Sequence, residues 1–311
     1  MGARPSLLPW ISSFLHGREQ MTRYNGVLSS SLTPVGGVPQ GTRLGPAIFL
    51  ALINDALTDA AGISRWKYVD DITFAESRRR GSCNMMPSTL TLFHQWCLDN
   101  GLRINSSKCK SMRVSFSRTE LPPLHLELDD TTLQEVKELK LLGVILQHNL
   151  RWDSHVRDIT GRASRKFYII RALKRYRAPV EDLLTIYTCY IRPVLEYCVP
   201  VWNSSITSEQ ANDIERVQRR ALRIIFHDRY HSYEHALQIS GLQSLSDRRE
   251  HLCLRFAESL YKHFRDWLPE MQSTNRRLRH SERLRDFKCR TERLRHSTLP
   301  YLVRTLNEHF F

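Results

Sequence analysis

The sequence Trp66-Lys67-Tyr68-Val69-Asp70-Asp71-Ile72-Thr73-Phe74 places two carboxylates between two runs in which apolar residues alternate with other residues. This alternation has the period of a β-strand, so the stretch predicts a hairpin that carries Asp70 and Asp71 at its bend. Adjacent carboxylates repel each other unless a cation or hydrogen-bond donors stabilise both charges. Oxygen ligands suit hard divalent ions, so the pair indicates part of a magnesium site. An Asp-Asp pair without further support is more often a surface turn or a helix cap.

A glycine-rich segment lies upstream of this pair, and it reads Gly37-Val38-Pro39-Gln40-Gly41-Thr42-Arg43-Leu44-Gly45-Pro46. Glycines let the backbone come close to a base or a phosphate, and the Gln40 amide can both donate and accept hydrogen bonds. Pro46 suits the first turn of a helix, and apolar residues then recur every three or four positions up to Leu57. The segment therefore predicts a loop that leads into a helix. A generic glycine-rich turn is the alternative interpretation.

The remaining pattern predicts an α+β half up to about residue 150 and an all-helical half beyond it. In the first half we expect the end of a helix at Leu7–Leu15, a helix over Asn84–Asn100 that is capped by Gly101, and strands at 111–116, 124–128 and 141–147. In the second half we expect helices over 153–176, 179–199, 208–226 and 246–264, the last two with a serine as N-cap.

Charge indicates a polyanionic partner. The chain has 46 Lys and Arg against 32 Asp and Glu, a formal net charge of +14, which favours nucleic acid over an uncharged partner. A basic cluster near the C-terminus offers candidate phosphate contacts, although a solvated basic face explains it equally well. Its members are Arg276, Arg277, Arg279, Arg283, Arg285, Arg293 and Arg295.

Cysteine spacing and hydropathy indicate in which cell compartment the protein is expected. The seven cysteines form no CxxC pair, which favours reduced thiols without a zinc site in an intracellular protein, cytoplasmic or nuclear. No apolar run reaches the roughly 18 residues of a membrane span. We expect neither a membrane association nor an obligate protein partner.

Taken in order, these motifs resemble the reverse transcriptases of non-LTR (LINE-type) retrotransposons. The loop 37–46 and the Tyr68-Val69-Asp70-Asp71 box are followed by Gly101-Leu102-Arg103-Ile104-Asn105 with Lys108. Next come Leu141-Leu142-Gly143-Val144 and then Trp152, Asp153 and His155. The resemblance covers essentially the whole chain. It is far more specific than any single motif, because several blocks occur in the family's order.

The resemblance implies the α+β fold of a partial right-hand polymerase. Residues 1–120 would form part of the palm, without the fingers and the strand that carries the first catalytic aspartate. Residues 121–152 would form the primer-grip strands, residues 153–265 a helical thumb or connection, and residues 266–311 a basic C-terminal segment.

The resemblance also implies a role for each matching residue. In the intact enzyme, Asp70 would bind catalytic Mg²⁺ or Mn²⁺ with support from Asp71, and Lys108 would donate a proton to departing pyrophosphate. The substrates would be an RNA template, a DNA primer and dNTPs. The other positions with implied roles are Gly37, Pro39, Gln40, Gly41 and Tyr68 for nucleotide and template, and Leu142 and Gly143 for the primer grip. Their structural alternatives are a turn carboxylate, a surface lysine, a helix-entry turn, a packed tyrosine and an apolar strand.

One expected ligand of this family has no counterpart here. Members carry a first metal-binding aspartate on an earlier strand, yet residues 1–41 contain no aspartate and only one glutamate, Glu19. An incomplete carboxylate set leaves the developing charge poorly stabilised. We therefore expect little or no polymerisation by this polypeptide alone. The alternatives are a non-catalytic nucleic-acid-binding relic that uses the basic helical half, and a degenerate copy without a biochemical function.

Overall fold

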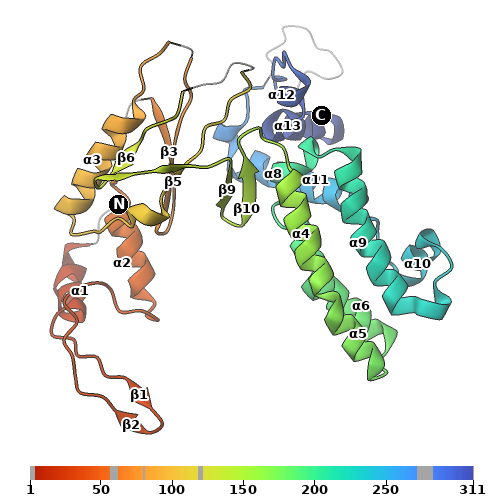
Figure 1. Ribbon diagram of the computed structural model, residues 1–311, viewed down its shortest axis with the longest axis horizontal. Helices are drawn as coiled ribbons and strands as arrows, with labels where there is room; N and C mark the ends of the chain where they lie inside the picture. Colours follow the sequence, from red (N-terminus) through yellow and green to blue (C-terminus); the bar gives the residue numbers. More distant parts are fainter. Residues whose placement is uncertain (1–3, 57–61, 80, 118–121, 272–282, 311) are drawn as a thin grey trace. The chain divides into compact units, whose positions relative to one another are not determined.

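The computed structural model describes residues 4–56, 62–79, 81–117, 122–271 and 283–310 (Figure 1). The chain divides into two compact units, of which the first comprises residues 1–111 and 122–135 and the second residues 112–121 and 136–311. Helices are combined with small two-stranded sheets, so the predicted α+β class is confirmed. No helix in the described ranges is both long and apolar enough to cross a membrane.

In its described residues, the first unit contains three α-helices, two 3₁₀ turns and short strands. Its helices are α1 (Leu8–Leu15, after the 3₁₀ turn Pro5–Leu7), α2 (Leu44–Ile53) and α3 (Met86–Asp99), with a further 3₁₀ turn at Ser106–Lys108. Its strands are β1 (Arg23–Tyr24), β2 (Val27–Leu28), β3 (Ile63–Tyr68), β4 (Asp71–Glu76), β5 (Lys110–Ser111), β6 (Glu127–Leu128), β7 (Thr131–Thr132) and β8 (Gln134–Glu135).

The predicted hairpin is confirmed. Strands β3 and β4 pair antiparallel, with Tyr68 opposite Asp71 and Trp66 opposite Thr73. One face of the hairpin packs Ile72 and Phe74 against α2 and α3, where Ile53, Phe93 and Cys97 are buried. Apolar burial at alternate positions of β4 therefore attaches the hairpin to both helices.

Helix α3 ends as its sequence predicts. Gly101 has a φ of +64°, which an L side chain rarely adopts. The Leu102 N–H donates to the Cys97 carbonyl at 2.8 Å and the Gly101 N–H to the Leu98 carbonyl at 3.1 Å. These two bonds form a Schellman motif, which satisfies carbonyls at the helix end.

Three of the predicted strands are wrong in extent. Of the range 111–116 only Ser111 lies in a strand, at the end of β5, and of the range 124–128 only Glu127–Leu128 does. The range 141–147 spans the last residue of β9 (Glu138–Leu141), the turn Leu142-Gly143 and all of β10 (Val144–Gln147), which pairs antiparallel with β9. Alternation of period two continues through a two-residue turn, so the pattern did not reveal the reversal at Leu142-Gly143.

The described residues of the second unit are mainly helical. After the β9–β10 hairpin come α4 (Asp153–Arg165), α5 (Phe167–Arg175), α6 (Val180–Ile186), a π-helical turn (Tyr187–Ile191), α7 (Arg192–Glu196), α8 (Val199–Trp202) and a 3₁₀ turn (Asn203–Ser205). The chain continues with α9 (Ser208–Phe226), a 3₁₀ turn (His227–Arg229), α10 (Tyr233–Ser240), α11 (Leu245–His263), a 3₁₀ turn (Arg265–Trp267), α12 (Glu292–Arg295) and α13 (Thr298–His309).

The helix expected over 179–199 is interrupted, and proline explains where. Pro193 has no N–H, so it cannot donate the backbone hydrogen bond that a regular α-helix would form at this position. The chain widens into the π-helical turn Tyr187–Ile191 just before it. The Lys166 ammonium donates to the Tyr190 carbonyl at 3.0 Å, and it lies 3.5 Å from the centre of the Tyr190 ring.

Two helices are capped by residues other than the serines that the sequence predicted. Thr207 caps α9 in a capping box with Gln210, and Ser244 caps α11 by accepting from the Asp247 N–H. Both caps lie one or two residues before the serines at 208 and 246. The prediction placed the caps too late because several Ser and Thr residues compete at each start.

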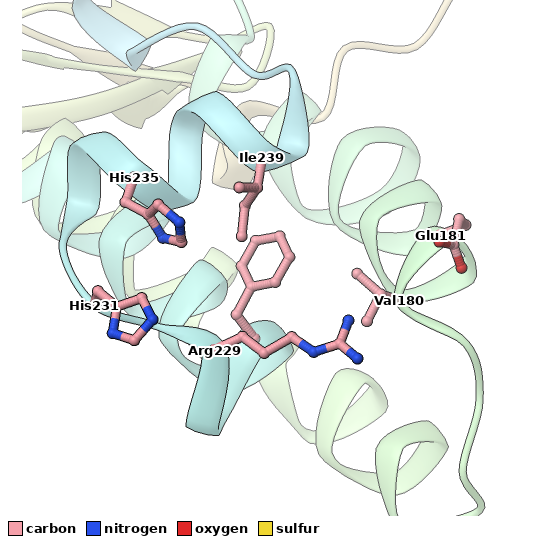
Figure 2. Close-up of a pocket in the computed structure, with 7 residues that line it drawn as sticks. Val180, Glu181, Arg229, His231, His235 and Ile239 are labelled. Atoms are coloured by element: carbon pink, nitrogen blue, oxygen red, sulfur yellow. The ribbon is translucent and has the colours of Figure 1, made fainter.

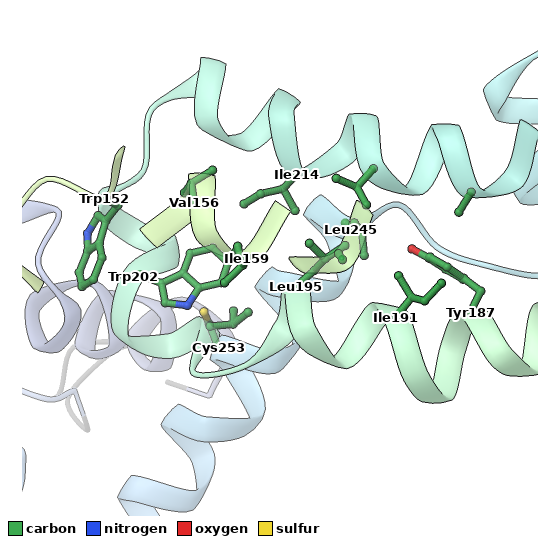
Figure 3. Packing of buried hydrophobic residues seen from close by; sticks show 14 of the residues in the cluster. Trp152, Val156, Ile159, Tyr187, Ile191, Leu195, Trp202, Ile214, Leu245 and Cys253 are labelled. Atoms are coloured by element: carbon green, nitrogen blue, oxygen red, sulfur yellow. The ribbon is translucent and has the colours of Figure 1, made fainter. Parts of the chain in front are cut away.

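The core of the second unit lies between α4, the α6–α7 segment, α9 and α11 (Figure 3). Trp202, Tyr187 and Phe167 are among its largest fully buried side chains. Helix α4 packs along α9, which also contacts α5, α6 and α11 (Figure 1). Burial of this many large apolar side chains makes the second unit the better-packed part of the described chain.

Candidate functional site

The tip of the β3–β4 hairpin holds the two candidate carboxylates in an exposed position. Val69 and Asp70 form the two-residue turn, and Asp71 is the first residue of β4. Val69 has a φ of +56°, which is a strained conformation for a β-branched residue. Strain of this kind persists only where the surrounding structure enforces it, and it is concentrated at functional sites.

A second Asp-Asp pair in the same unit serves as an internal comparison. Asp129 and Asp130 form the turn between β6 and β7, and both have a φ of +53°. Asp residues tolerate this conformation well. Asp129 also lies 3.3 Å from the His94 ring nitrogen, so this pair has the character of an ordinary turn. The pair at 70 and 71 instead places the conformational strain on a valine.

Lys67 joins the hairpin to the C-terminal end of α2. Its ammonium donates to the Ile53 carbonyl at 2.9 Å and to the Asn54 carbonyl at 2.6 Å. A cation at a helix C-terminus satisfies carbonyls that have no partner in the helix. Burial and the nearby Arg65 charge lower the pKa of Lys67, while the Asp55 carboxylate opposes this shift. The sequence interpretation did not single out Lys67.

The glycine-rich loop folds back on the start of α2. The Thr42 hydroxyl donates to the Pro39 carbonyl at 2.9 Å and accepts from the Gly45 N–H at 3.1 Å. A Cβ on Gly45 would lie 3.0 Å from the Pro39 carbonyl oxygen, so the loop requires glycine there. Arg18 holds the other side by donating to the Gly37 carbonyl at 2.8 Å.

The predicted nucleotide and template residues are exposed or half-buried. Gly37 and Gly41 have φ values of +82° and +78°, and Gln40 is exposed in this loop. Tyr68 is 63% exposed beside the carboxylates. Side chains on this unit are thus accessible to a ligand.

Lys108 lies at the end of the 3₁₀ turn Ser106–Lys108 and is exposed. Within the described ranges, no hydrogen bond or ion pair joins Lys108, Gln40 and the two aspartates. The hairpin and α2 do share one apolar cluster. Lys67, however, binds the end of α2 opposite to the loop, about 15 Å away for a helix of this length.

The carboxylate chemistry fits a hard divalent ion only in part. Asp70 and Asp71 are exposed at one turn and offer oxygen ligands of the kind that Mg²⁺ and Mn²⁺ prefer. In the part of the chain that the structure describes, no group of three or more His, Cys, Asp or Glu side chains could hold a metal ion. The described residues therefore supply two ligands.

Leu142 and Gly143 lie in the second unit, at the turn between β9 and β10. Both have positive φ values, +45° and +86°, which is the pattern of a type I′ turn. The Tyr197 hydroxyl donates to the Leu142 carbonyl at 2.8 Å. The expected apolar strand is thus a tightly held turn with Leu142 at its exposed tip.

The predicted arginines of the C-terminal segment have different surroundings. Arg276, Arg277 and Arg279 lie outside the described residues. Arg293 stacks over the Phe116 ring at 4.0 Å, and Arg295 lies 3.6 Å from Glu292. The segment also contains Arg283, which is half-buried, and Arg285, which is exposed.

A basic face on α4 and α5 was missed by the sequence interpretation. We define it as Arg157, Gly161, Arg165, Tyr168, Arg171 and Arg175, which follow one another at three- or four-residue intervals and therefore share a side of the helices. All except Gly161 are exposed. A search for arginine at the helical period would have found this face.

The only acids between residues 153 and 177 are held by other groups. Asp158 pairs with Arg162 at 2.9 Å, and Asp153 accepts from the Gln210 amide at 2.8 Å. Among the ion pairs of the described residues, none involves an arginine of the basic face. Its positive charge is therefore available to an anionic partner.

A hollow of about 580 Å³ lies elsewhere in the second unit (Figure 2). It is lined by Val180, Glu181, Phe226, Arg229, His231, His235 and Ile239. The rings of His231 and His235 lie 5.1 Å apart. None of the predicted site residues lines it.

Comparison with known proteins is consistent across several relatives. Residues 1–146 match the family model described as reverse transcriptase (RNA-dependent DNA polymerase). The chain is 24% identical over 225 residues to a probable RNA-directed DNA polymerase from transposon X-element of Drosophila melanogaster, covering 69% of this chain and 24% of that protein. It is 25% identical over 237 residues to the RNA-directed DNA polymerase from mobile element jockey of Drosophila funebris, covering 71% of this chain and 25% of that protein.

A third relative agrees. The probable RNA-directed DNA polymerase from transposon BS of Drosophila melanogaster is 25% identical over 230 residues, which covers 69% of this chain and 25% of that protein. The chain thus spans about a quarter of the length of these relatives. Residues 1–146 thus match the reverse transcriptase family model, and the chain is similar to the RNA-directed DNA polymerases of LINE-type retrotransposons.

Proposed function

We propose that this chain forms part of an RNA-directed DNA polymerase of a retrotransposon and contributes two catalytic carboxylates, a nucleotide loop and duplex-binding helices. The observation that carries the proposal is the strained turn at Val69, which presents Asp70 and Asp71 on a hairpin whose residues Ile72 and Phe74 pack on the helix that follows the glycine-rich loop. The related polymerases from X-element and jockey support this proposal. The polypeptide alone would bind primer–template but extend it little or not at all.

Asp70 and Asp71 would hold the divalent ions of nucleotidyl transfer. When bound, Mg²⁺ or Mn²⁺ would activate the primer hydroxyl and stabilise the charge on the leaving pyrophosphate. The two carboxylates would hold those ions at the hairpin tip, next to the strained Val69 turn. With a third carboxylate lacking among the described residues, the ions would be under-coordinated and the rate correspondingly low.

The remaining residues would orient substrates. Tyr68 would pack against the primer end or the incoming dNTP, and Gln40 would contact the template base or the dNTP. Lys108 would transfer a proton to the departing pyrophosphate. Gln40 and Lys108 are both exposed, so both side chains would be accessible to a bound nucleotide.

This proposal assigns residues 1–120 to a partial palm, 121–152 to primer-grip strands, 153–265 to a thumb or connection and 266–311 to a basic segment. Residues of the β9–β10 turn, Leu142 and Gly143, would contact the primer. The basic face would follow the sugar-phosphate backbone of the template–primer duplex without reading its sequence.

The metal site can be tested without polymerase activity. Fe²⁺ with ascorbate and peroxide produces radicals that cleave a polypeptide backbone close to the bound ion. We expect cleavage near residue 70 that excess Mg²⁺ suppresses and that Asp70→Asn/Asp71→Asn abolishes. The variant Asp129→Asn/Asp130→Asn is the matched control, because it removes an Asp-Asp turn of the same unit and should leave the cleavage unchanged. Equal cleavage in both variants would contradict the proposed metal site.

Primer extension tests the expected lack of strong activity. The purified chain is incubated with a DNA primer on an RNA template, dNTPs and Mg²⁺ or Mn²⁺, and the products are separated by length. We expect little or no extension. Robust extension that Asp70→Asn abolishes would show that the chain is catalytically sufficient.

A second candidate function is non-catalytic nucleic-acid binding, and the basic face is the observation that favours it. In this case the aspartates would be irrelevant to affinity. We expect Asp70→Asn/Asp71→Asn to bind an RNA–DNA duplex as the unmodified chain does. The variant Arg157→Glu/Arg171→Glu should bind more weakly and with a flatter salt dependence, because each lost phosphate contact lowers the slope by about 0.9. Arg216→Glu/Arg255→Glu is the control for a change of the same net charge elsewhere.

A further inference from the structure

The β9–β10 hairpin is attached to the helical core at two places, its turn and its second strand, β10. At the tip, the Tyr197 hydroxyl donates to the Leu142 carbonyl at 2.8 Å. Tyr197 follows the last residue of α7 and therefore stands at a helix end rather than on a loop of its own. The contact joins residues 55 positions apart in the chain.

The Tyr197 ring also lies directly against the second turn residue. A Cβ on Gly143 would be 3.1 Å from the Tyr197 Cε1 atom, closer than a carbon–carbon contact of about 3.5 to 4.0 Å. Gly143 is therefore required for two reasons, its φ of +86° and the aromatic ring that covers it. The hydroxyl bond and the ring contact hold the turn from one side.

The second attachment is made by His155 on α4. Its Nδ1 atom accepts from the Ile145 N–H at 3.3 Å, on the edge of β10 that does not face β9. His155 is fully buried, and its ring lies between the rings of Trp152 and Trp202, whose centres are 5.9 and 5.7 Å away. Strand β10 thus donates to a buried side chain that contacts two tryptophan rings, and movement of this side chain would require both tryptophans to repack.

Trp202 links the two attachments. Its indole N–H donates to the Tyr197 carbonyl at 2.9 Å, and its ring contacts His155. Trp202 is fully buried in the core of the second unit (Figure 3). Turn, strand, tyrosine, tryptophan and histidine therefore form a closed set of contacts within one unit.

This arrangement leaves one part of the turn uncovered. Leu142 is 44% exposed although it is apolar and its backbone is strained. A fold gains nothing from holding an exposed leucine in this conformation, whereas a binding surface gains from a rigid contact because less freedom is lost on binding.

We propose that Tyr197 is a positioning residue that holds the Leu142-Gly143 turn rigid for contact with the 3′ end of a primer strand, with His155 as the second anchor. This role rests on the proposed function, since it assumes that the turn meets a primer. Tyr197 itself acts through the turn and touches no substrate.

The test uses an RNA–DNA duplex with a recessed DNA primer that carries 4-thiothymidine at its 3′ end. Ultraviolet light crosslinks this base to adjacent protein, and mass spectrometry locates the crosslink. We expect the unmodified chain to crosslink at or next to Leu142. Tyr197→Phe keeps the ring but removes the hydroxyl, and we expect it to reduce this crosslink by roughly two- to ten-fold, the range for loss of one hydrogen bond. Affinity for a blunt duplex of the same sequence should be unchanged.

Two further variants make the result specific. Tyr197→Ala should reduce the crosslink further than Tyr197→Phe, because the ring contact with Gly143 is lost as well. The control Tyr24→Phe removes the hydroxyl of an exposed tyrosine in the first unit, and it should crosslink as the unmodified chain does.

The outcomes separate the two proposals. If the unmodified chain crosslinks at the turn but Tyr197→Phe and Tyr197→Ala crosslink equally well, the positioning role is wrong while the primer-grip assignment stands. If the unmodified chain binds the duplex but crosslinks elsewhere, or does not bind, the assignment of the turn to primer contact is wrong and the positioning role falls with it. A loss of blunt-duplex affinity equal to the loss of crosslink would mean a general structural defect and would also overturn the role.

Discussion

His155 shows how one buried side chain can make the stability of the second unit depend on pH. Burial lowers the pKa of His155 below its usual 6.5, and the nearby Arg162 and Lys140 charges act in the same direction, while Asp158 opposes them. The folded chain therefore holds this ring neutral, with Nδ1 free to accept from the Ile145 N–H. Protonation would place a second donor against that N–H.

The first prediction concerns acid. Between pH 6.5 and the lower pKa of the folded state, the unfolded chain binds a proton that the folded chain does not. The contribution of the neutral His155 ring to the free energy of unfolding is therefore fully present above pH 6.5. It falls as the pH decreases through this window, by up to about 1.4 kcal/mol per pH unit. Urea unfolding of His155→Gln, which keeps an acceptor but does not titrate, should show a smaller difference between pH 7.5 and 5.5. His231→Gln, at an exposed histidine, should retain the full difference.

Lys67 carries the second residue-level prediction. Lys67→Met keeps the length of the side chain but removes both hydrogen bonds to the end of α2. We expect a loss of about 1 to 2 kcal/mol in the free energy of unfolding of the first unit, because two carbonyls lose their donor. Denaturant titration measures it, with Lys110→Met at an exposed position as the control. Equal stability of the two variants would contradict the capping role.

At the scale of elements, replacing two glycines by alanine should change the free energy of unfolding in opposite directions. One glycine lies where the loop meets α2, and the other lies on the basic face. Gly45→Ala would place a methyl group 3.0 Å from the Pro39 carbonyl oxygen, and overpacking of this kind costs about 1 to 3 kcal/mol. Gly161→Ala, within α4, meets nothing closer than an Arg165 nitrogen at 3.7 Å. It should stabilise the helix by about 0.5 to 1 kcal/mol. Circular dichroism during denaturation measures both, and effects of the same sign would refute the interpretation.

Elements were predicted from sequence where a local pattern was sufficient. The hairpin at 66–74 follows from alternation alone, and the end of α3 follows from Gly101. The reversal at Leu142-Gly143 was not predicted, because a leucine in the left-handed region is held there by Tyr197, far along the chain. The break before Pro193 was likewise visible as a proline, but the bond from Lys166 to the Tyr190 carbonyl inside the π-helical turn was not predicted.

At the scale of the whole molecule, the two units differ in how well they bury apolar surface. The core of the second unit includes fully buried Trp202 and Leu222, whereas the clusters of the first unit are smaller and Trp10 and Trp66 are exposed there. We expect unfolding in two steps, with the first unit unfolding first. Phe93→Ala should shift only the lower transition and Leu222→Ala only the upper, each by about 2 to 5 kcal/mol. A single transition that both variants shift would contradict independent units.

The cysteines test the packing of both units at once. All seven are free, and burial raises the pKa of Cys97 and of Cys253 to about 11. Only the thiolate reacts with a thiol reagent. At pH 8 we expect exposed Cys83 and Cys189 to react in the folded chain and the two buried thiols only after denaturation. Mass spectrometry locates the modified residues, and rapid labelling of Cys97 in the folded chain would contradict the described packing.

The sequence by itself determined the α+β class, the hairpin that carries Asp70 and Asp71, the glycine loop with its helix and the resemblance to reverse transcriptases, because each depends on residues close together in the chain or on the order of motifs. Only the tertiary structure decided which residues hold these motifs in place. Lys67, Tyr197 and His155 each bind a group on another element of the fold. Contacts between distant residues depend on how helices pack, which no local pattern of residues specifies.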